Sequence, residues 1–213
     1  MTHAYNELYL DDAMKNLGDM VHYAVADCGY EVDEFFRIFI ASGIASRFER
    51  GNPKYIAGMS GVELAQETLR TVCNVTDFPK ATYTEGCSRE YWAGWILAYY
   101  QWFRKKRFED IVKDGLTLST VFSMYILHEA DESKFVENAD IIIEKYKSEN
   151  CSKLQKIRKA RGFTQKQLSD ASGVTMRMIQ LYEQRQNDIN KAQVNVVLSL
   201  AKALGCSIED LLE

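Results

Sequence analysis

Side chains that commonly carry catalysis or metal binding are few and scattered in this sequence of 213 residues. The three histidines are His3, His22 and His128. The pair His128-Glu129 begins like a zinc-protease motif, but no second histidine follows at the spacing that would put two ligands on one helix face. We find no glycine-rich phosphate loop and no serine in a nucleophile elbow, and a meeting of His22 with Cys28 would be accidental. We therefore predict no enzyme activity, no cofactor and no metal site.

Charge, in contrast, is distributed unevenly along the chain. Residues 151–213 contain ten basic and six acidic residues, whereas residues 1–150 contain 16 basic and 24 acidic ones. A basic segment beside an acidic body is the distribution expected when only the basic segment meets phosphate. A short helical segment can also be basic by chance. We prefer the phosphate interpretation because the basic charge coincides with the motif described next.

Residues 163–183 contain a pattern for two short helices joined by a tight turn. Thr164 and Gln167 form a capping box that begins the first helix. Gly173 lies where the chain reverses, because glycine adopts the left-handed conformation without a steric penalty. Thr175 then caps the second helix. We expect Gln165, Arg177 and Gln180 to lie outside and the apolar residues to form a wedge between the helices: Leu168, Ala171, Val174, Ile179 and Tyr182. The pattern predicts a helix-turn-helix.

Residues 152–213 resemble the Cro/cI/Xre-type DNA-binding domain, a lambda-repressor-like bundle of about five helices. The likeness rests on Gln165 at a helix start, on the turn Gly173-Val174-Thr175, and on the run Leu200-Ala201-Lys202-Ala203-Leu204-Gly205 followed by Ser207 to Leu212. It covers less than a third of the chain. The resemblance implies binding to double-stranded DNA.

The resemblance also assigns roles to individual residues. It implies that the helix from Thr175 to Glu183 enters the major groove, where the fork of Arg177 matches guanine O6 and N7. Three apolar residues are expected on this exposed face, Met176, Met178 and Leu181. They could meet thymine methyl groups, or they could form a protein-docking surface that has replaced DNA reading. Arg158 and Glu183 fall on positions that pair in the family, so we expect a structural ion pair. The candidate DNA-contacting residues are Gln165, Lys166, Thr175, Met176, Arg177, Met178, Leu181, Arg185 and Lys191.

The segment after this helix departs from the family pattern. Most members turn quickly through a glycine, whereas residues 184–191 form a longer segment without glycine. We therefore expect the recognition helix to continue for another turn. A longer helix argues against the phosphate contacts assigned to Arg185 and Lys191 in this segment.

Residues 1–148 are predicted to form a separate acidic helical domain. The aromatic face of its most aromatic helix (Trp92, Trp95, Tyr99 and Trp102) is interpreted as core, with a groove for a partner helix or a small apolar effector as the alternative. The cations 104–107 would complement the end of that helix, and a second DNA-contacting patch is the alternative. Predicted helices cover residues 5–28, 32–41, 91–103, 117–128 and 131–146, and a further helix begins at the capping box Ser60/Glu63. Ser88 caps the helix at 91–103, and residues 74–86 are predicted to form a loop.

Composition and periodicity thus predict an all-α protein, a helical bundle at residues 1–148 followed by a five-helix domain at 152–213. Five scattered cysteines without a CxxC pair indicate reduced thiols in a cytosol. Acidic residues near the N-terminus argue against a signal peptide, and no apolar run reaches membrane-spanning length. We therefore expect a cytoplasmic protein without a membrane partner.

Three functional hypotheses remain open. The first is a DNA-binding transcriptional regulator, a repressor by preference, whose N-terminal domain dimerises or binds an effector. The second is an antitoxin-like regulator whose N-terminal domain neutralises a partner toxin while the helix-turn-helix represses the shared operon. Residues 125–135 have only a loose likeness to such proteins. The third is an interaction module that no longer reads DNA. We expect a homodimer, because one such domain covers only half of a palindromic site.

Overall fold

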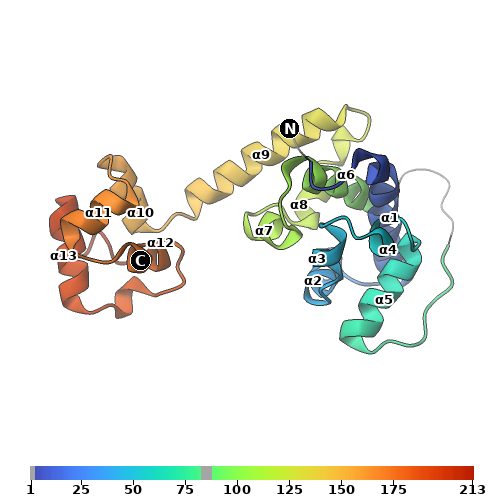
Figure 1. The fold of residues 1–213 in the computed structure, drawn as a ribbon, viewed down its shortest axis with the longest axis horizontal. Coiled ribbons are helices and arrows are strands. Elements are labelled where there is room, and N and C mark those ends of the chain that lie inside the picture. Colours follow the sequence, from blue (N-terminus) through green and yellow to red (C-terminus); the bar gives the residue numbers. More distant parts are fainter. Residues whose placement is uncertain (1–2, 83–87) are drawn as a thin grey trace. The chain divides into compact units, whose positions relative to one another are not determined.

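The computed structural model describes residues 3–82 and 88–213, and within these ranges it contains helices and no strand (Figure 1). This is the all-α fold class that the sequence predicts. The chain divides into two compact units, unit 1 at Met1–Tyr146 and unit 2 at Lys147–Glu213. No helix within the described ranges is both long and apolar enough to span a bilayer.

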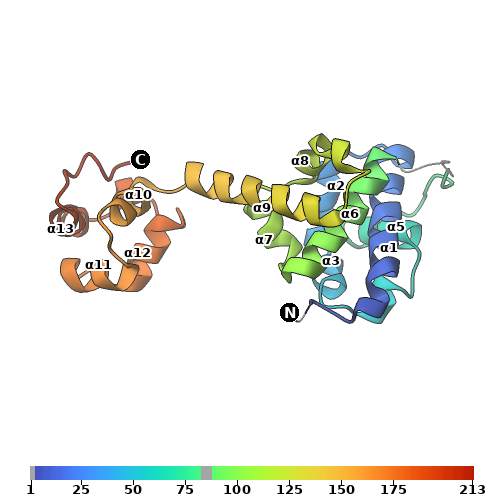
Figure 2. The same ribbon diagram turned by 90° about the horizontal axis from the view of Figure 1, so that it is seen from above.

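Unit 1 is a bundle in which the longer helices α1, α5 and α6 pack together around one core (Figures 1 and 2). Its elements are η1 (Glu7–Tyr9), α1 (Leu10–His22), the π-helical turn η2 (Tyr23–Asp27), α2 (Val32–Ala41), α3 (Ile44–Phe48), α4 (Pro53–Ile56), α5 (Gly61–Cys73), α6 (Arg89–Arg104), α7 (Phe108–Lys113), α8 (Leu118–Ser123), η3 (Tyr125–Leu127) and α9 (Glu132–Glu149). The last turn of α9, from Lys147 on, already belongs to unit 2. The predicted loop at 74–86 is irregular up to Thr82. Its remaining residues, and Cys87 after them, lie outside the described ranges.

The closest helix contact in unit 1 joins α1 to α6 through small residues. A Cβ atom added to Gly94 of α6 would lie 2.3 Å from the carbonyl oxygen of Leu17, and one added to Gly18 of α1 would lie 2.9 Å from Tyr91. The two backbones therefore approach as closely as glycine allows. On α6, Trp92 and Trp102 are buried, while Trp95 and Tyr99 are half-buried against the same core. This face is core, as the sequence analysis preferred.

Several predicted boundaries in unit 1 are wrong. The first helix begins only at Leu10, because the Asn6 side chain accepts a hydrogen bond from Leu8 N at 3.0 Å and holds the preceding residues in a 3-10 turn. Leu8, within the helix expected at residues 5–28, is 85% exposed. The helix expected at 117–128 is two pieces, α8 and η3. The six-residue α7 was not predicted at all, because so short a segment shows little periodicity.

Cations at 104–107 pair with carboxylates of unit 1. Arg104 pairs with Asp140, and Lys106 Nζ lies 3.2 Å from Asp114. Arg107 lies 3.6 Å from the buried Glu49 and 2.5 Å from the exposed Glu109. These cations therefore fasten the end of α6 to its neighbours.

Unit 2 contains α10 (Lys153–Ala160), α11 (Gln165–Ser172), α12 (Met176–Glu183), the 3-10 turn η4 (Ile189–Lys191) and α13 (Val194–Leu204) around its own core. The segment Ser207 to Leu212, which carries part of the family resemblance, is a series of turns. Ser207 and Asp210 cap each other as at a helix start, but the backbone bond that follows, Leu211 N to Ile208 O, spans three residues rather than four. Leu211 is nevertheless fully buried, so this segment closes the core without forming a helix.

Candidate nucleic-acid interface

The helix-turn-helix of unit 2 is α11, the turn at Gly173 and α12. Thr164 and Gln167 form the capping box at the start of α11, and Thr175 Oγ1 accepts from Met178 N at 3.3 Å to cap α12. Gly173 has φ 71°, so it takes the left-handed conformation that the reversal requires. Of the predicted wedge, four members are buried: Leu168, Val174, Ile179 and Tyr182. The fifth member, Ala171, is exposed, so its expected place in the wedge is wrong.

A buried ion pair fixes α12 against α10. Arg158 Nε and Nη2 donate to the two carboxylate oxygens of Glu183 at 2.5 and 2.9 Å. The Arg158 side chain is 9% exposed and the Glu183 side chain 1%. Two further bonds complete the network: Arg158 Nη1 donates to Phe163 O at 2.6 Å, and Gln165 Nε2 donates to Glu183 at 2.7 Å. Such bidentate charge-assisted bonds set the orientation of the helix they join.

The amide of Gln165 therefore has a role that the sequence analysis did not foresee. Gln165 was expected to contact phosphate, but its Nε2 is committed to Glu183 and the residue is half-buried. The capping box already uses the backbone N–H of Gln167, which donates to Thr164 Oγ1 at 3.1 Å. The backbone N–H groups of Gln165 and Lys166 at this helix start are left to meet an anion. Lys166, the next residue, is exposed and makes no ion pair with any described residue.

The exposed part of α12 is its first turn. Thr175 and Arg177 are exposed, and Met176 is 45% exposed. Arg177 makes no ion pair within the described part of the chain. Met178 and Leu181, expected to be exposed, are half-buried, and Met178 packs against the core of unit 2. The apolar surface that the sequence predicted on this helix is therefore narrower, because only Met176 among its three apolar members is largely open.

The expectation that the recognition helix continues for another turn is wrong. The helix ends at Glu183, and Arg185 adopts a left-handed conformation with φ 55°, the position at which a glycine usually stands. Arg185 N donates to Tyr182 O at 3.1 Å and Gln186 N donates to Leu181 O at 2.9 Å. These two bonds are those of the Schellman motif, so a non-glycine residue ends this helix in the usual glycine geometry.

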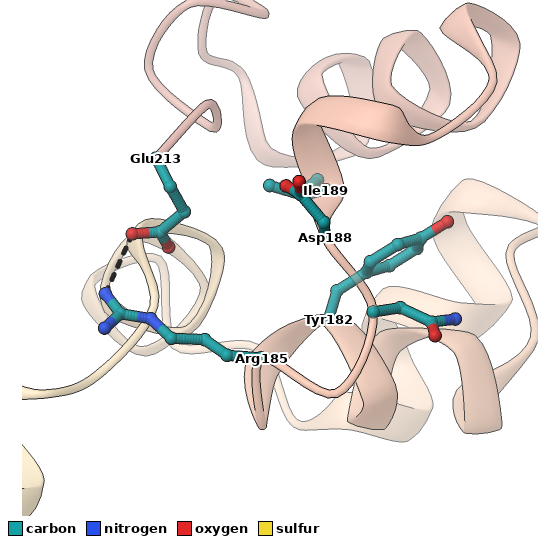
Figure 3. A pocket seen from close by; sticks show the side chains of 6 residues that line it. Tyr182, Arg185, Asp188, Ile189 and Glu213 are labelled. Carbon is teal, nitrogen blue, oxygen red and sulfur yellow. Dashed lines mark hydrogen bonds and ion pairs between the residues drawn. The ribbon is translucent and has the colours of Figure 1, made fainter.

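Two residues after α12 that are predicted to contact phosphate, Arg185 and Lys191, have ion-pair partners within the chain. Figure 3 shows the side chain of Arg185 turned toward Glu213, with its Nη2 atom 2.8 Å from the carboxylate. Lys191 Nζ lies 3.5 Å from Asp188, although Lys191 is 84% exposed. Arg185, Asp188 and Glu213 line a small hollow of about 330 Å³ together with Tyr182, Asn187 and Ile189. Arg185 can reach phosphate only by leaving Glu213, whereas Lys191 can do so with little rearrangement.

Glu213 is the residue in this region that the sequence analysis missed. Its carboxylate accepts from Arg185 and, at 2.8 Å, from the backbone N of Lys153 at the start of α10. Its own backbone N donates to Asn190 Oδ1 at 3.1 Å. These contacts join positions 23 to 60 residues apart, so no local pattern could have indicated them.

Comparison with protein-family models matches residues 154–211 to a family described as helix-turn-helix. Comparisons with curated proteins and with solved structures found no match. The family match indicates a DNA-binding transcription regulator and does not extend to unit 1. Both the residues matched and the geometry agree with the resemblance read from the sequence, and residues 154–211 form a Cro/cI/Xre-type helix-turn-helix domain.

Proposed function

We propose that the protein is a sequence-specific transcriptional repressor that reads DNA through the first turn of α12. The observation that carries this proposal is the exposed Arg177, which has no ion-pair partner among the described residues, on a helix that the buried Arg158–Glu183 pair holds in place. Because the helix is already rigid, binding to guanine O6 and N7 restricts only the side chain of Arg177. Lys166 and the start of α11 supply phosphate contacts that orient the domain.

The test begins with selection of duplexes from a random pool by the full chain, followed by affinity measurements on the enriched sequence. We expect Arg177→Ala to cost about 1–3 kcal/mol of binding free energy and to relax the preference at one base pair. Lys166→Ala should weaken binding to all sequences alike and reduce the salt slope by about one. Lys202→Ala, at an exposed cation on α13, is the matched control. Affinity that is independent of salt, or unchanged base preference in Arg177→Ala, would contradict the proposal.

We further propose that unit 1 makes the protein a homodimer on DNA, with two recognition helices about one helical turn apart. Support comes from large apolar side chains that unit 1 leaves open: Ile126 is 85% exposed and Ile141 is 62% exposed. Light scattering of the full chain, alone and with the selected duplex, measures the stoichiometry. Two chains on one palindrome are expected. One chain protecting one half-site would refute the dimer.

A second candidate function rests on the same apolar residues. In an antitoxin-like protein, unit 1 would use Ile126 and Ile141 to bind a different protein while unit 2 represses the shared operon. Substitution of both residues by Asp separates the two ideas. If the double variant no longer self-associates, the dimer is supported. If the wild-type chain is already a monomer and the double variant no longer binds a co-encoded protein, the antitoxin function is supported. If no duplex is enriched from the random pool, the third hypothesis is favoured, in which the face of α12 that carries the exposed Met176 binds a protein and no longer reads DNA.

A further inference from the structure

A solvent-open hollow of about 380 Å³ lies in unit 1, whereas the residues assigned to DNA belong to unit 2. Its lining includes four cations from two segments: Arg50, Lys105, Lys106 and Arg107. The opposing charge in the lining is Glu49, which is 8% exposed. Glu49 is already engaged, because its carboxylate accepts from Phe108 N at 2.9 Å and lies 3.6 Å from Arg107. Two of these cations also have partners outside the lining, because Lys106 pairs with Asp114 and Arg107 with Glu109. An anion would share Lys106 and Arg107 with those carboxylates. The lining itself still contains more cations than acids, and its volume suits a small ligand.

Buried polar atoms without partners gather at the same place. Within the described ranges, three buried side-chain atoms have no hydrogen-bond partner: His3 Nδ1, Tyr5 OH and Gln101 Oε1. His3 and Gln101 both line the hollow, and Tyr5 is tied to the same helix because its carbonyl accepts from Trp102 Nε1 at 2.9 Å. Buried polar atoms in folded proteins are almost always satisfied. Their concentration here indicates a partner that binds from outside the chain.

Gln101 defines what that partner must offer. The residue is 1% exposed, and its Nε2 donates to the carbonyl oxygens of Glu49 at 3.3 Å and Lys106 at 3.2 Å. Because both neighbours of Nε2 are acceptors, the amide orientation is settled and Oε1 is left to accept a bond. The missing partner at Gln101 is therefore an O–H or N–H donor, in addition to the negative charge that the cations favour.

The backbone at Lys105 points to the same site. Lys105 ends α6 in the left-handed conformation with φ 52°, which normally favours glycine or asparagine. A long side chain at such a position carries a steric cost, and such costs are concentrated at functional sites. At this position the lysine adds a cation to the lining of the hollow.

We propose that this hollow is a binding site for a small organic oxyanion, a phosphate or carboxylate that also carries a hydroxyl or amino donor. The cations Arg50, Lys105, Lys106 and Arg107 hold the anionic group, and Gln101 Oε1 accepts from the donor group. A DNA backbone is the less suitable ligand, because Gln101 is almost fully buried at the wall of a concave site that a stiff duplex cannot enter. The site is independent of the proposed reading of DNA by unit 2.

The experiment is isothermal titration calorimetry of the full chain at physiological ionic strength. The probes are inorganic phosphate, glucose 6-phosphate and citrate, with uncharged glucose as the negative probe. We expect saturable binding of at least one organic anion with a Kd near or below about 1 mM, and none of glucose. Glucose 6-phosphate and citrate distinguish the phosphate from the carboxylate source. A non-specific duplex should not displace the bound anion, and displacement would overturn the proposal in favour of a second DNA-contacting patch.

Two variants and one control test the residues. Arg50→Ala removes an exposed cation and should weaken anion binding roughly tenfold. Lys105→Gly should weaken binding similarly while raising Tm by roughly 2 °C, because it removes the left-handed strain. Arg37→Ala, at an exposed cation of α2 outside the hollow, should leave binding unchanged.

Opposite changes in stability and binding for Lys105→Gly separate a lost ligand contact from a damaged fold. Absence of binding by every anion would mean that the hollow holds water only, and it would overturn the proposal. Equal affinity in both variants and wild type, or an equal loss in Arg37→Ala, would overturn it as well.

Discussion

Replacing Glu183 by Gln tests the buried network that positions α12. The substitution preserves side-chain volume but removes the charge and places an N–H donor where an oxygen accepts. Glu183 now accepts three bonds, at 2.5 and 2.9 Å from Arg158 and at 2.7 Å from Gln165. After the change Arg158, whose side chain is 9% exposed, remains charged without a full partner.

The magnitude follows from this burial. Removing one partner of a buried pair costs about 3–5 kcal/mol of unfolding free energy, and the near-complete burial here places the expectation in that range. Small domains have about 5–15 kcal/mol in total, so unit 2 should lose much of its stability. Replacing both members together, Arg158→Met with Glu183→Leu, should cost less than Glu183→Gln, since no buried charge remains. Recovery should be incomplete, because Phe163 O and Gln165 Nε2 lose their partners.

The assay can separate the two units of the full chain. All three tryptophans, Trp92, Trp95 and Trp102, lie in unit 1, so tryptophan fluorescence follows that unit, whereas far-ultraviolet circular dichroism follows both. In urea, Glu183→Gln should move part of the dichroism transition to lower concentration and leave the fluorescence transition in place. Hydrogen exchange should locate the new opening in α10 to α12. A loss below about 1 kcal/mol, or a matching shift in fluorescence, would refute the argument.

Three further outcomes follow from local geometry. Arg185→Gly should be more stable than Arg185→Ala by roughly 1 kcal/mol in urea denaturation, because both lose the exposed ion pair but only glycine relieves φ 55°; equal stabilities would contradict this. Gly94→Ala should destabilise unit 1 by about 3 kcal/mol in tryptophan-monitored unfolding, because its Cβ would lie 2.3 Å from the Leu17 carbonyl; an unchanged midpoint would show that α1 and α6 separate freely. Hydrogen bonds from Ser60 hold the pKa of Glu63 below its usual 4.5. Because the pKa of Glu63 is lower in the folded chain than in the unfolded one, the stability that Glu63 contributes is complete above the unfolded pKa and is lost as pH falls through the folded pKa. Glu63→Gln should therefore flatten the acid dependence of Tm. An acid profile identical to that of the wild type would rule the contribution out.

Much of the local structure could be predicted from the sequence because its causes are local. The capping boxes at Ser60 and Thr164, the Ser88 cap of α6 and the left-handed Gly173 each depend on residues within one or two helical turns. The helix-turn-helix is encoded in such signals together with apolar spacing at 3.6 residues per turn. Its match to a known family at residues 154–211 agrees with that local origin.

The end of α12 shows where local rules gave the wrong result. The absence of glycine in residues 184–191 predicted a longer helix, yet Arg185 takes the left-handed position. Its ion pair with Glu213 and the two Schellman bonds stabilise that end. Propensity is a weak preference that contacts distant in sequence can override.

The chemical state of the candidate sites was decided by tertiary structure. Gln165 and Arg185 both looked available to phosphate in the sequence, but Glu183 and Glu213 accept hydrogen bonds from them in the folded chain. Gln101 Oε1 likewise has no partner because the backbone carbonyl oxygens of Glu49 and Lys106 both accept from Nε2 of the same amide. Residue type determines what a side chain can donate or accept, and that much the sequence contains. Which partners remain unmet depends on packing between segments far apart in the chain, so only the fold decides it.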